Sequence, residues 1–107
     1  MAQFTADDVQ RALMTNLTGE TAVIAAPGAG KRIVILGLML IPDAVAAAIE
    51  IESGTTDIIP IFDLAADTPL VLPPGPVPWL VCTANEALNV TADAAINGVV
   101  LYVVETV

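Results

Sequence analysis

Residues 33–41 are apolar at every position except one glycine, and the run ends at Pro42. Successive side chains of a strand point to opposite faces, so a strand with one wet face alternates apolar and polar residues. Here both alternating sets are apolar: Ile33, Ile35, Met39 and Ile41 on one face, and Val34, Leu36, Leu38 and Leu40 on the other. The run at 96–104 repeats this, with Ile96, Val100, Tyr102 and Val104 opposite Val99, Leu101 and Val103. Both segments predict strands that are covered on both faces.

No helical pattern follows either strand, so a second subunit is the natural cover for one face. The alternative is that loops or the N-terminal segment fold over it. Hydrophobic residues make up 56% of the 107-residue chain, and a domain of this size has a limited interior. Alanine, which tolerates exposure, contributes to that percentage. The number of hydrophobic residues beyond what the interior can hold still favours an apolar interface. We therefore predict a homo-oligomer, whose interface or core residues are Val34, Leu36, Leu38, Leu40, Val99, Leu101 and Val103.

From Thr21 onward, short β-type runs alternate with turn signals. The segment 45–52 is the clearest, because Val45, Ala47, Ile49 and Ile51 share one face while Glu50 and Glu52 share the other. Turn spacings of about 8–12 residues are typical of antiparallel β-sandwiches and barrels. The sequence predicts an all-β domain with strands at 21–26, 32–41, 45–52, 57–64, 69–72, 79–83, 88–91 and 96–105.

The first 18 residues differ from the rest. Thr5 followed by Asp7 and Asp8 is typical of a helix start. We expect a short helix or arm over 1–18 and the β-domain over 19–107. Two functions are open for the segment: it caps one end of the domain, or it attaches the protein to a partner through Phe4, Val9, Leu13 and Met14.

The net charge of −9, from 12 acidic and 3 basic residues, argues against nucleic-acid binding, because phosphate backbones repel such a chain. The longest apolar run is far shorter than the roughly 20 residues that cross a bilayer. The N-terminus lacks a basic segment followed by an apolar one, so we expect no signal peptide, no membrane contact and synthesis in a cytoplasm.

The chain has no histidine and a single cysteine, Cys82. The commonest general base, the usual catalytic triads and the usual zinc ligands are therefore missing. Acidic residues at 50, 52, 57, 63 and 67 do not have the density of a calcium loop, and same-face strand carboxylates are more often solvated. We expect no enzymatic activity, no catalytic residues, no metal and no cofactor.

Four segments carry a family resemblance: 31–38 (KRIVILGL), 49–56 (IEIESGTT), 79–90 (WLVCTANEALNV) and 98–104 (GVVLYVV). Their order over 20–105 resembles small jelly-roll proteins of tailed-bacteriophage virions, both capsid decoration (cement) proteins and the bases of head fibres or spikes. The resemblance implies an eight-stranded antiparallel jelly-roll sandwich. It also implies a homotrimer that is attached where capsid subunits meet.

The expected function is therefore that of a structural virion protein, a capsid decoration protein that forms trimers on the head surface. Its partners are copies of itself and the major capsid protein or another virion protein, and its location is the virion, after synthesis in the host cytoplasm. The alternative is a carbohydrate- or receptor-binding module of a phage fibre or tail, in which Trp79 and Tyr102 stack on sugars.

Overall fold

The structure, a computed structural model, describes residues 8–107, and its regular elements are all antiparallel strands. None of these residues belongs to a helix of the length and hydrophobicity that a bilayer crossing requires. The predicted all-β class is confirmed. The strands are β1 (Gln10–Ile24), β2 (Lys31–Pro42), β3 (Ala47–Ser53), β4 (Thr56–Leu64), β5 (Leu70–Leu72), β6 (Leu80–Val81) and β7 (Leu88–Thr106).

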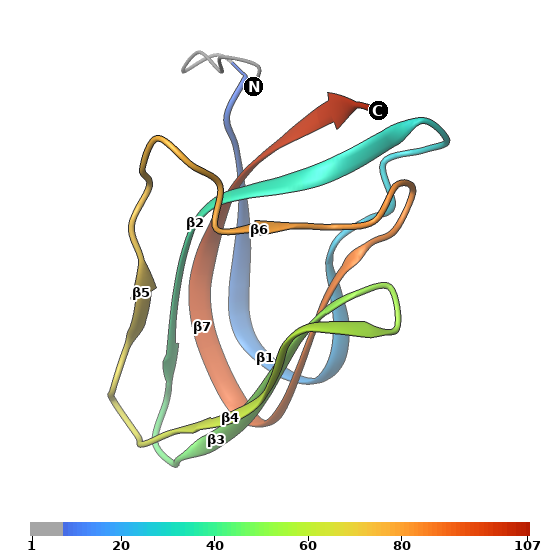
Figure 1. The fold of residues 1–107 in the computed structure, drawn as a ribbon. Helices are drawn as coiled ribbons and strands as arrows, with labels where there is room; N and C mark the ends of the chain where they lie inside the picture. Colours follow the sequence, from blue (N-terminus) through green and yellow to red (C-terminus); the bar gives the residue numbers. More distant parts are fainter. Residues whose placement is uncertain (1–7) are drawn as a thin grey trace.

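The long strand β7 organises the sheet. One of its edges pairs with β1 over residues 88–102, and the other edge is shared by β2, over residues 96–106, and β3, over residues 88–92. β5 and β6 extend the sheet beyond β2, and β4 extends it beyond β3. Figure 1 shows β1 and β7 following the same bend, so that the sheet curls and its two parts face one another.

We call these parts the β2 half and the β3 half. The β2 half contains β2, β5, β6, the C-terminal part of β7 and residues 10–17 of β1. The β3 half contains β3, β4, the N-terminal part of β7 and residues 19–24 of β1.

The bend has a local cause in β1. Its register against β7 shifts between Met14 and Leu17 and again between Leu17 and Gly19. Asn16 and Gly19 have positive φ values of 48° and 72°, and such bulges bend a strand and increase its twist. The amide of Asn16 stays satisfied, because it donates to Oδ1 of Asn97 on β7 (2.9 Å).

The concave side of the curled sheet holds the core. β3 confirms the predicted alternation over Ala47–Glu52: Ala47, Ile49 and Ile51 are buried, and Glu50 and Glu52 lie on the opposite face. Val45, which was predicted to share the buried face, precedes the strand and is exposed. The same cluster takes side chains from both halves, including Met14, Ile33, Ile35, Leu38, Leu40, Leu88, Val90, Ile96 and Val100.

β2 departs from the predicted alternation. Its register against β7 shifts between Ile35 and Gly37, so Leu36 is an extra residue. One extra residue moves all later side chains to the opposite face. Ile33 and Ile35 therefore share the core side with Leu38 and Leu40, and the predicted separation of these two pairs is wrong.

Two further expectations need correction. The described residues form seven strands rather than eight, because the segments expected at 88–91 and 96–105 are one continuous strand, β7. Residues 10–18 are strand and not helix, since pairing with β7 outweighs a weak local helical pattern. The expected helix start at Thr5 lies outside the described residues.

Candidate functional site

The outer, convex surface of the β2 half carries a row of apolar side chains across four strands. Leu13 pairs with Val99, Val99 with Met39, and Met39 with Val71, so the four lie side by side on β1, β7, β2 and β5. Paired residues of adjacent strands point to the same face. The exposed fractions are 65% for Leu13, 42% for Met39 and 52% for Val71, so this row faces outward.

A second apolar row lies further along β7 and β2 and continues onto β6. Val103 pairs with Val34, and Val34 pairs with Val81. Val34 and Val103 are buried but do not belong to the core cluster, whereas Val81 is exposed. Leu101 lies between the two rows, where it pairs with Gly37. We call this surface the apolar face; its members are Leu13, Val34, Met39, Val71, Val81, Val99, Leu101 and Val103.

The apolar face has a shallow hollow at its β5 side. The ring of Pro74 lies over Gly37, and a Cβ on that glycine would come within 3.0 Å of the ring. The hollow has a volume of about 170 Å³ and is lined mainly by Gly37, Met39, Val71, Pro74, Val99 and Leu101. Glycine at 37 therefore allows the loop to approach the sheet closely and form one wall.

A proline-rich loop, residues 73–79, borders the apolar face and holds Trp79. The indole N–H of Trp79 donates to the carbonyl oxygen of Pro73 (2.6 Å), and its backbone N–H donates to the carbonyl oxygen of Ile35 (2.9 Å). The side chain is still 47% exposed. It lies beside a hollow of about 360 Å³ lined by Gly75, Pro76, Val77, Pro78 and Trp79. The loop thus presents a fixed, half-exposed aromatic ring next to the apolar face.

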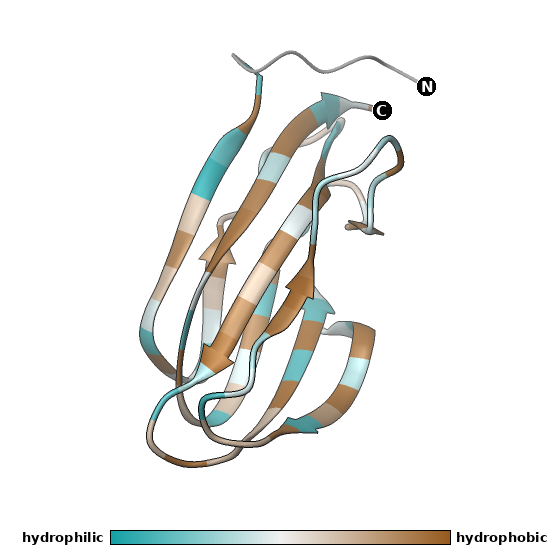
Figure 2. Ribbon diagram, turned by 90° about the vertical axis from the view of Figure 1, so that its left-hand side faces the viewer, coloured by the Kyte–Doolittle hydropathy of each residue, from teal (hydrophilic) through white to brown (hydrophobic). Residues whose placement is uncertain are grey.

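The outer surface of the β3 half is different in chemistry. Strand pairing places Glu20 beside Thr91 and Thr91 beside Glu50, and it places Glu52 beside Asp57. In Figure 2, β2 and the C-terminal part of β7 are mostly brown, the apolar end of the scale. We call the surface of the β3 half the acidic face; its carboxylates belong to Glu20, Glu50, Glu52, Asp57, Asp63 and Asp93.

Three of these carboxylates converge. Oxygen atoms of Glu50, Glu52 and Asp57 lie within 4.8 Å of one another. Partial burial of Glu50, the charge of Asp57 and a hydrogen bond with it, and the charges of Glu52 and Glu20 together raise the pKa of Glu50. Calcium takes six to eight oxygen ligands from carboxylates, carbonyls and waters, so these three carboxylates would supply part of such a set, although exposed acidic groups also converge without an ion. Asp63 and Asp67, which the sequence grouped with them, do not join this cluster.

Ser53 and Cys82 are side chains with nucleophilic atoms that meet in the interior. The Ser53 hydroxyl donates to Glu86 Oε1 (2.8 Å) and accepts from the backbone N–H of Thr83 (2.9 Å). Both Ser53 and Cys82 are buried. Burial raises the pKa of the Cys82 thiol, and the charge of Glu86 adds to this, while a hydrogen bond with Ser53 acts in the opposite direction. The arrangement therefore ties the turn after β3 to the 82–87 loop rather than activating a nucleophile.

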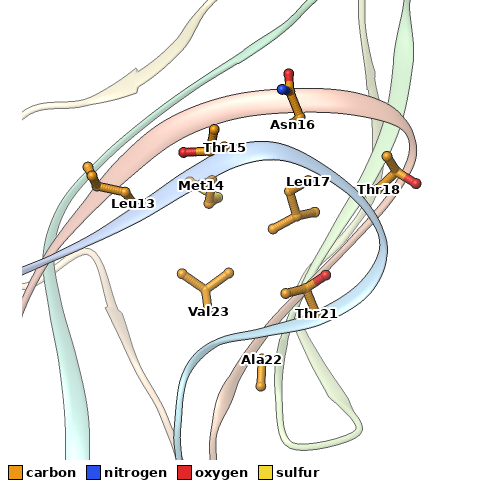
Figure 3. A pocket seen from close by; sticks show the side chains of 9 residues that line it. All are labelled: Leu13, Met14, Thr15, Asn16, Leu17, Thr18, Thr21, Ala22 and Val23. Carbon is orange, nitrogen blue, oxygen red and sulfur yellow. The ribbon is translucent and has the colours of Figure 1, made fainter.

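A third hollow lies inside the bend of β1. Figure 3 shows the side chains of Leu13 to Thr18 on one side of it and those of Thr21 to Val23 on the other. Its volume is about 460 Å³, and hydroxyl groups of Thr15, Thr18 and Thr21 are among its lining groups. It lies at the β1 side of the sheet, where β1 pairs with β7 alone.

The residues predicted for the interface or core fall into three places. Leu38 and Leu40 lie in the core, Val34 and Val103 are buried on the apolar face, and Leu36, Val99 and Leu101 are half-buried. Of the predicted attachment residues, Leu13 lies on the apolar face, Met14 lies in the core, Val9 is half-buried, and Phe4 lies outside the described residues.

The sequence reasoning missed Val71 and Val81 as members of a shared surface. Both lie in very short strands beside prolines, where no alternation can be recognised. Searches of protein-family models, of curated proteins and of solved structures found no match to this chain. Its function must therefore be inferred from its own surfaces and from the resemblance described above.

Proposed function

We propose that this chain is a structural virion protein, a jelly-roll capsid decoration protein that forms trimers on the head of a tailed bacteriophage. Its partners are other copies of itself and the major capsid protein or another virion protein. The resemblance of residues 20–105 supports the class. The observation that carries the proposal is the exposed part of the apolar face, where Leu13, Met39 and Val71 lie in one row on the outer surface of the sheet.

Uncovered apolar surface of this extent has a physical cost. Each Å² of apolar surface that leaves water contributes about 25 cal/mol, so a partner on this face is strongly favoured. Contiguous exposed apolar patches of several hundred Å² typically mark interaction sites. The net charge of −9 keeps such a protein dispersed until it meets its partner. The burial of Ser53 and Cys82 supports a structural rather than an enzymatic function.

The test is the composition of virus particles from the source of this sequence. We expect mass spectrometry to find the chain in purified particles at a stoichiometry comparable to a capsid protein. We also expect cryo-electron microscopy to place it on the head surface. Particles that contain the major capsid protein but not this chain would contradict the proposal.

Attachment through the N-terminal segment is part of this proposal, in a narrower form. Met14 lies in the core and Leu13 on the apolar face, so the attachment residues become Phe4 and Val9. Deleting residues 1–7 leaves β1 intact. The truncated protein is expected to keep its Tm and its self-association but to lose particle binding. Undiminished binding would instead assign attachment to the sheet.

Trp79 favours a second candidate function, binding of carbohydrate or a receptor by a fibre or tail module. An exposed ring beside a hollow is a common stacking platform, and a hydrogen bond to Pro73 orients the ring of Trp79. Its indole N–H already donates to Pro73, so the flat face of the ring is the part that remains for a sugar. A glycan-array signal that Trp79→Ala abolishes would support this candidate over the first.

A further inference from the structure

We propose that the apolar face binds a second copy of this chain, with Leu13 of one copy seated in the Pro74-walled hollow of the next copy. The proposal rests on the assembly function proposed above and names the surface that performs self-association. Three independent observations support it: the distribution of charge, the size of the face, and the match between its projecting and recessed parts.

Charge restricts where two copies can meet. Six of the 12 acidic residues lie on the acidic face of the β3 half, where contact between copies would place carboxylates against carboxylates. The members of the apolar face are uncharged, and its charged neighbours are Arg11, which pairs with Leu101, and the Arg32–Glu105 ion pair at the end of the face. Like charges opposed across an interface are costly. Two strongly acidic chains are therefore best joined through the apolar face.

The size of the face lies near the lower limit of specific interfaces. Four strands at about 4.8 Å spacing, and the eight residues 34–41 at about 3.4 Å each, span roughly 500 Å² of sheet, of which the part at Val34 and Val103 is already covered. Specific interfaces begin at roughly 600 Å² per partner. A fully buried tryptophan accounts for about 150–250 Å², and Trp79, which is 47% exposed, can add about half of that, together with exposed Val77 beside the face. Sheet and loop together therefore come close to the area that a specific pair of copies needs.

The face also has complementary parts. Leu13 is the most exposed large apolar residue of the face, at 65%, and it stands on β1. The hollow lies over β7, β2 and β5, and β1 is not among the strands that line it. Leu13 projects from one flank of the face, and the hollow is recessed on the other. Leu13 of one copy can therefore dock in the hollow of the next. The same contact can close a ring of three copies, because each copy offers one flank of each kind.

The first test replaces an apolar residue with a charge. Leu13→Asp and Val71→Asp place a carboxylate at the contact, and Ile61→Asp is the matched control, since Ile61 is 63% exposed on β4 in the other half. We expect light scattering at micromolar concentration to give a multiple of the chain mass for the unchanged protein and for Ile61→Asp. Both contact variants should give the monomer mass while circular dichroism shows a folded β-protein.

The second test is a crosslink that does not depend on variant stability. Within one chain, Leu13 and Val71 stand three strands apart, roughly 14 Å, which is beyond the reach of a disulfide. Chains with Leu13→Cys mixed with chains with Val71→Cys, both in a Cys82→Ala background, should form a disulfide under mild oxidation. Ile61→Cys in place of Val71→Cys should not.

A monomeric unchanged protein, or contact variants that keep its oligomer mass and give no mixed disulfide, would overturn the proposal. These outcomes are distinct from failure of the proposed function. A monomer that is nonetheless present in virus particles would refute the self-association face and leave the virion assignment standing. If the protein forms an oligomer through the Leu13 contact but is missing from virus particles, the self-association face stands and the virion assignment is refuted.

Discussion

The two halves of the curled sheet share one core but present opposite chemistry to the outside. The β2 half carries apolar residues on both sides of its strands, whereas the β3 half is apolar inside and acidic outside. A single strand, β7, runs through both, so the change occurs within one element. The comparison shows that the excess of hydrophobic residues is concentrated in one half, where a partner can cover it.

The halves also differ in what holds their strands in place. In the β2 half the backbones approach closely: a Cβ on Gly98 of β7 would overlap the carbonyl oxygen of Met39 and lie 2.8 Å from Cα of Leu40. In the β3 half, polar side chains make ties such as the bond from Asn89 Nδ2 to the Gly54 carbonyl oxygen (2.6 Å). Substitutions can therefore test the two halves separately.

The largest effect is expected for Gly98→Ala. The obstacle is backbone of β2 rather than a flexible side chain, so the two strands must separate. We expect a loss of about 3 kcal/mol or more of unfolding free energy, at or above the upper end for overpacked sites. Urea unfolding measures it. Gly75→Ala is the control, because nothing lies within 4 Å of its Cβ position; equal stability of the two variants would contradict the close approach.

Ser53→Ala is expected to have the next largest effect, in the β3 half. The substitution leaves the Thr83 N–H without its acceptor and removes a donor from Glu86. Loss of a buried hydrogen-bond partner costs about 1–3 kcal/mol. Thr68→Ala is the control, since its 3.5 Å bond to the Ala66 carbonyl oxygen is exposed. If thermal unfolding gives the same Tm for both variants, the Ser53 network does not hold the turn.

The difference between the halves was only partly predictable from the sequence. β3 could be predicted well, because Glu50 and Glu52 mark its outer face and nothing interrupts its alternation. Residues 33–41 of β2 contain no polar side chain that marks a face, so the bulge at Leu36 could not be recognised. The bulge lies next to Gly37, which packs against the ring of Pro74 from a loop far along the chain.

The candidate site shows the same limit. Val99 and Leu101 were predicted as interface or core because their strand is apolar on both faces, but their neighbours Met39 and Val71 depend on register. If the register of β2 were shifted by one residue, the side chain of Met39 would point into the core. The helical pattern around Leu13 was misleading for a related reason, since only pairing with β7 fixes β1 as a strand.

A smaller effect is expected for Arg32→Gln at the end of β2. The Arg32 guanidinium forms an ion pair with Glu105, with Nε at 2.6 Å from Oε1. The pair is partly exposed, so its loss should cost no more than about 1 kcal/mol, and 1 M salt should remove most of the difference. Lys31→Gln is the control for charge alone. A cost that does not depend on salt would show that packing, not charge, is responsible.

The smallest effect, and the only stabilising one, is expected for Glu50→Gln on the acidic face. Partial burial and the carboxylates of Asp57, Glu52 and Glu20 raise the pKa of Glu50 in the folded protein. The folded state therefore binds a proton more readily than the unfolded state, which favours folding at acidic pH. This contribution is lost as the pH rises through the folded-state pKa, so at neutral pH the ionised Glu50 is unfavourable.

Removing that charge should raise the Tm slightly at pH 7 and leave it unchanged near pH 3, where Glu50 is protonated in both states. Added salt should shrink the gain, because it screens the same repulsion. The salt response is then opposite in the two halves: screening weakens the Arg32–Glu105 pair of the β2 half and relieves the carboxylates of the β3 half. A Glu50→Gln gain that persists at pH 3 would mean that the substitution acts through packing. The charge of the acidic face would then not destabilise the folded state, and its function would have to be the repulsion of other molecules.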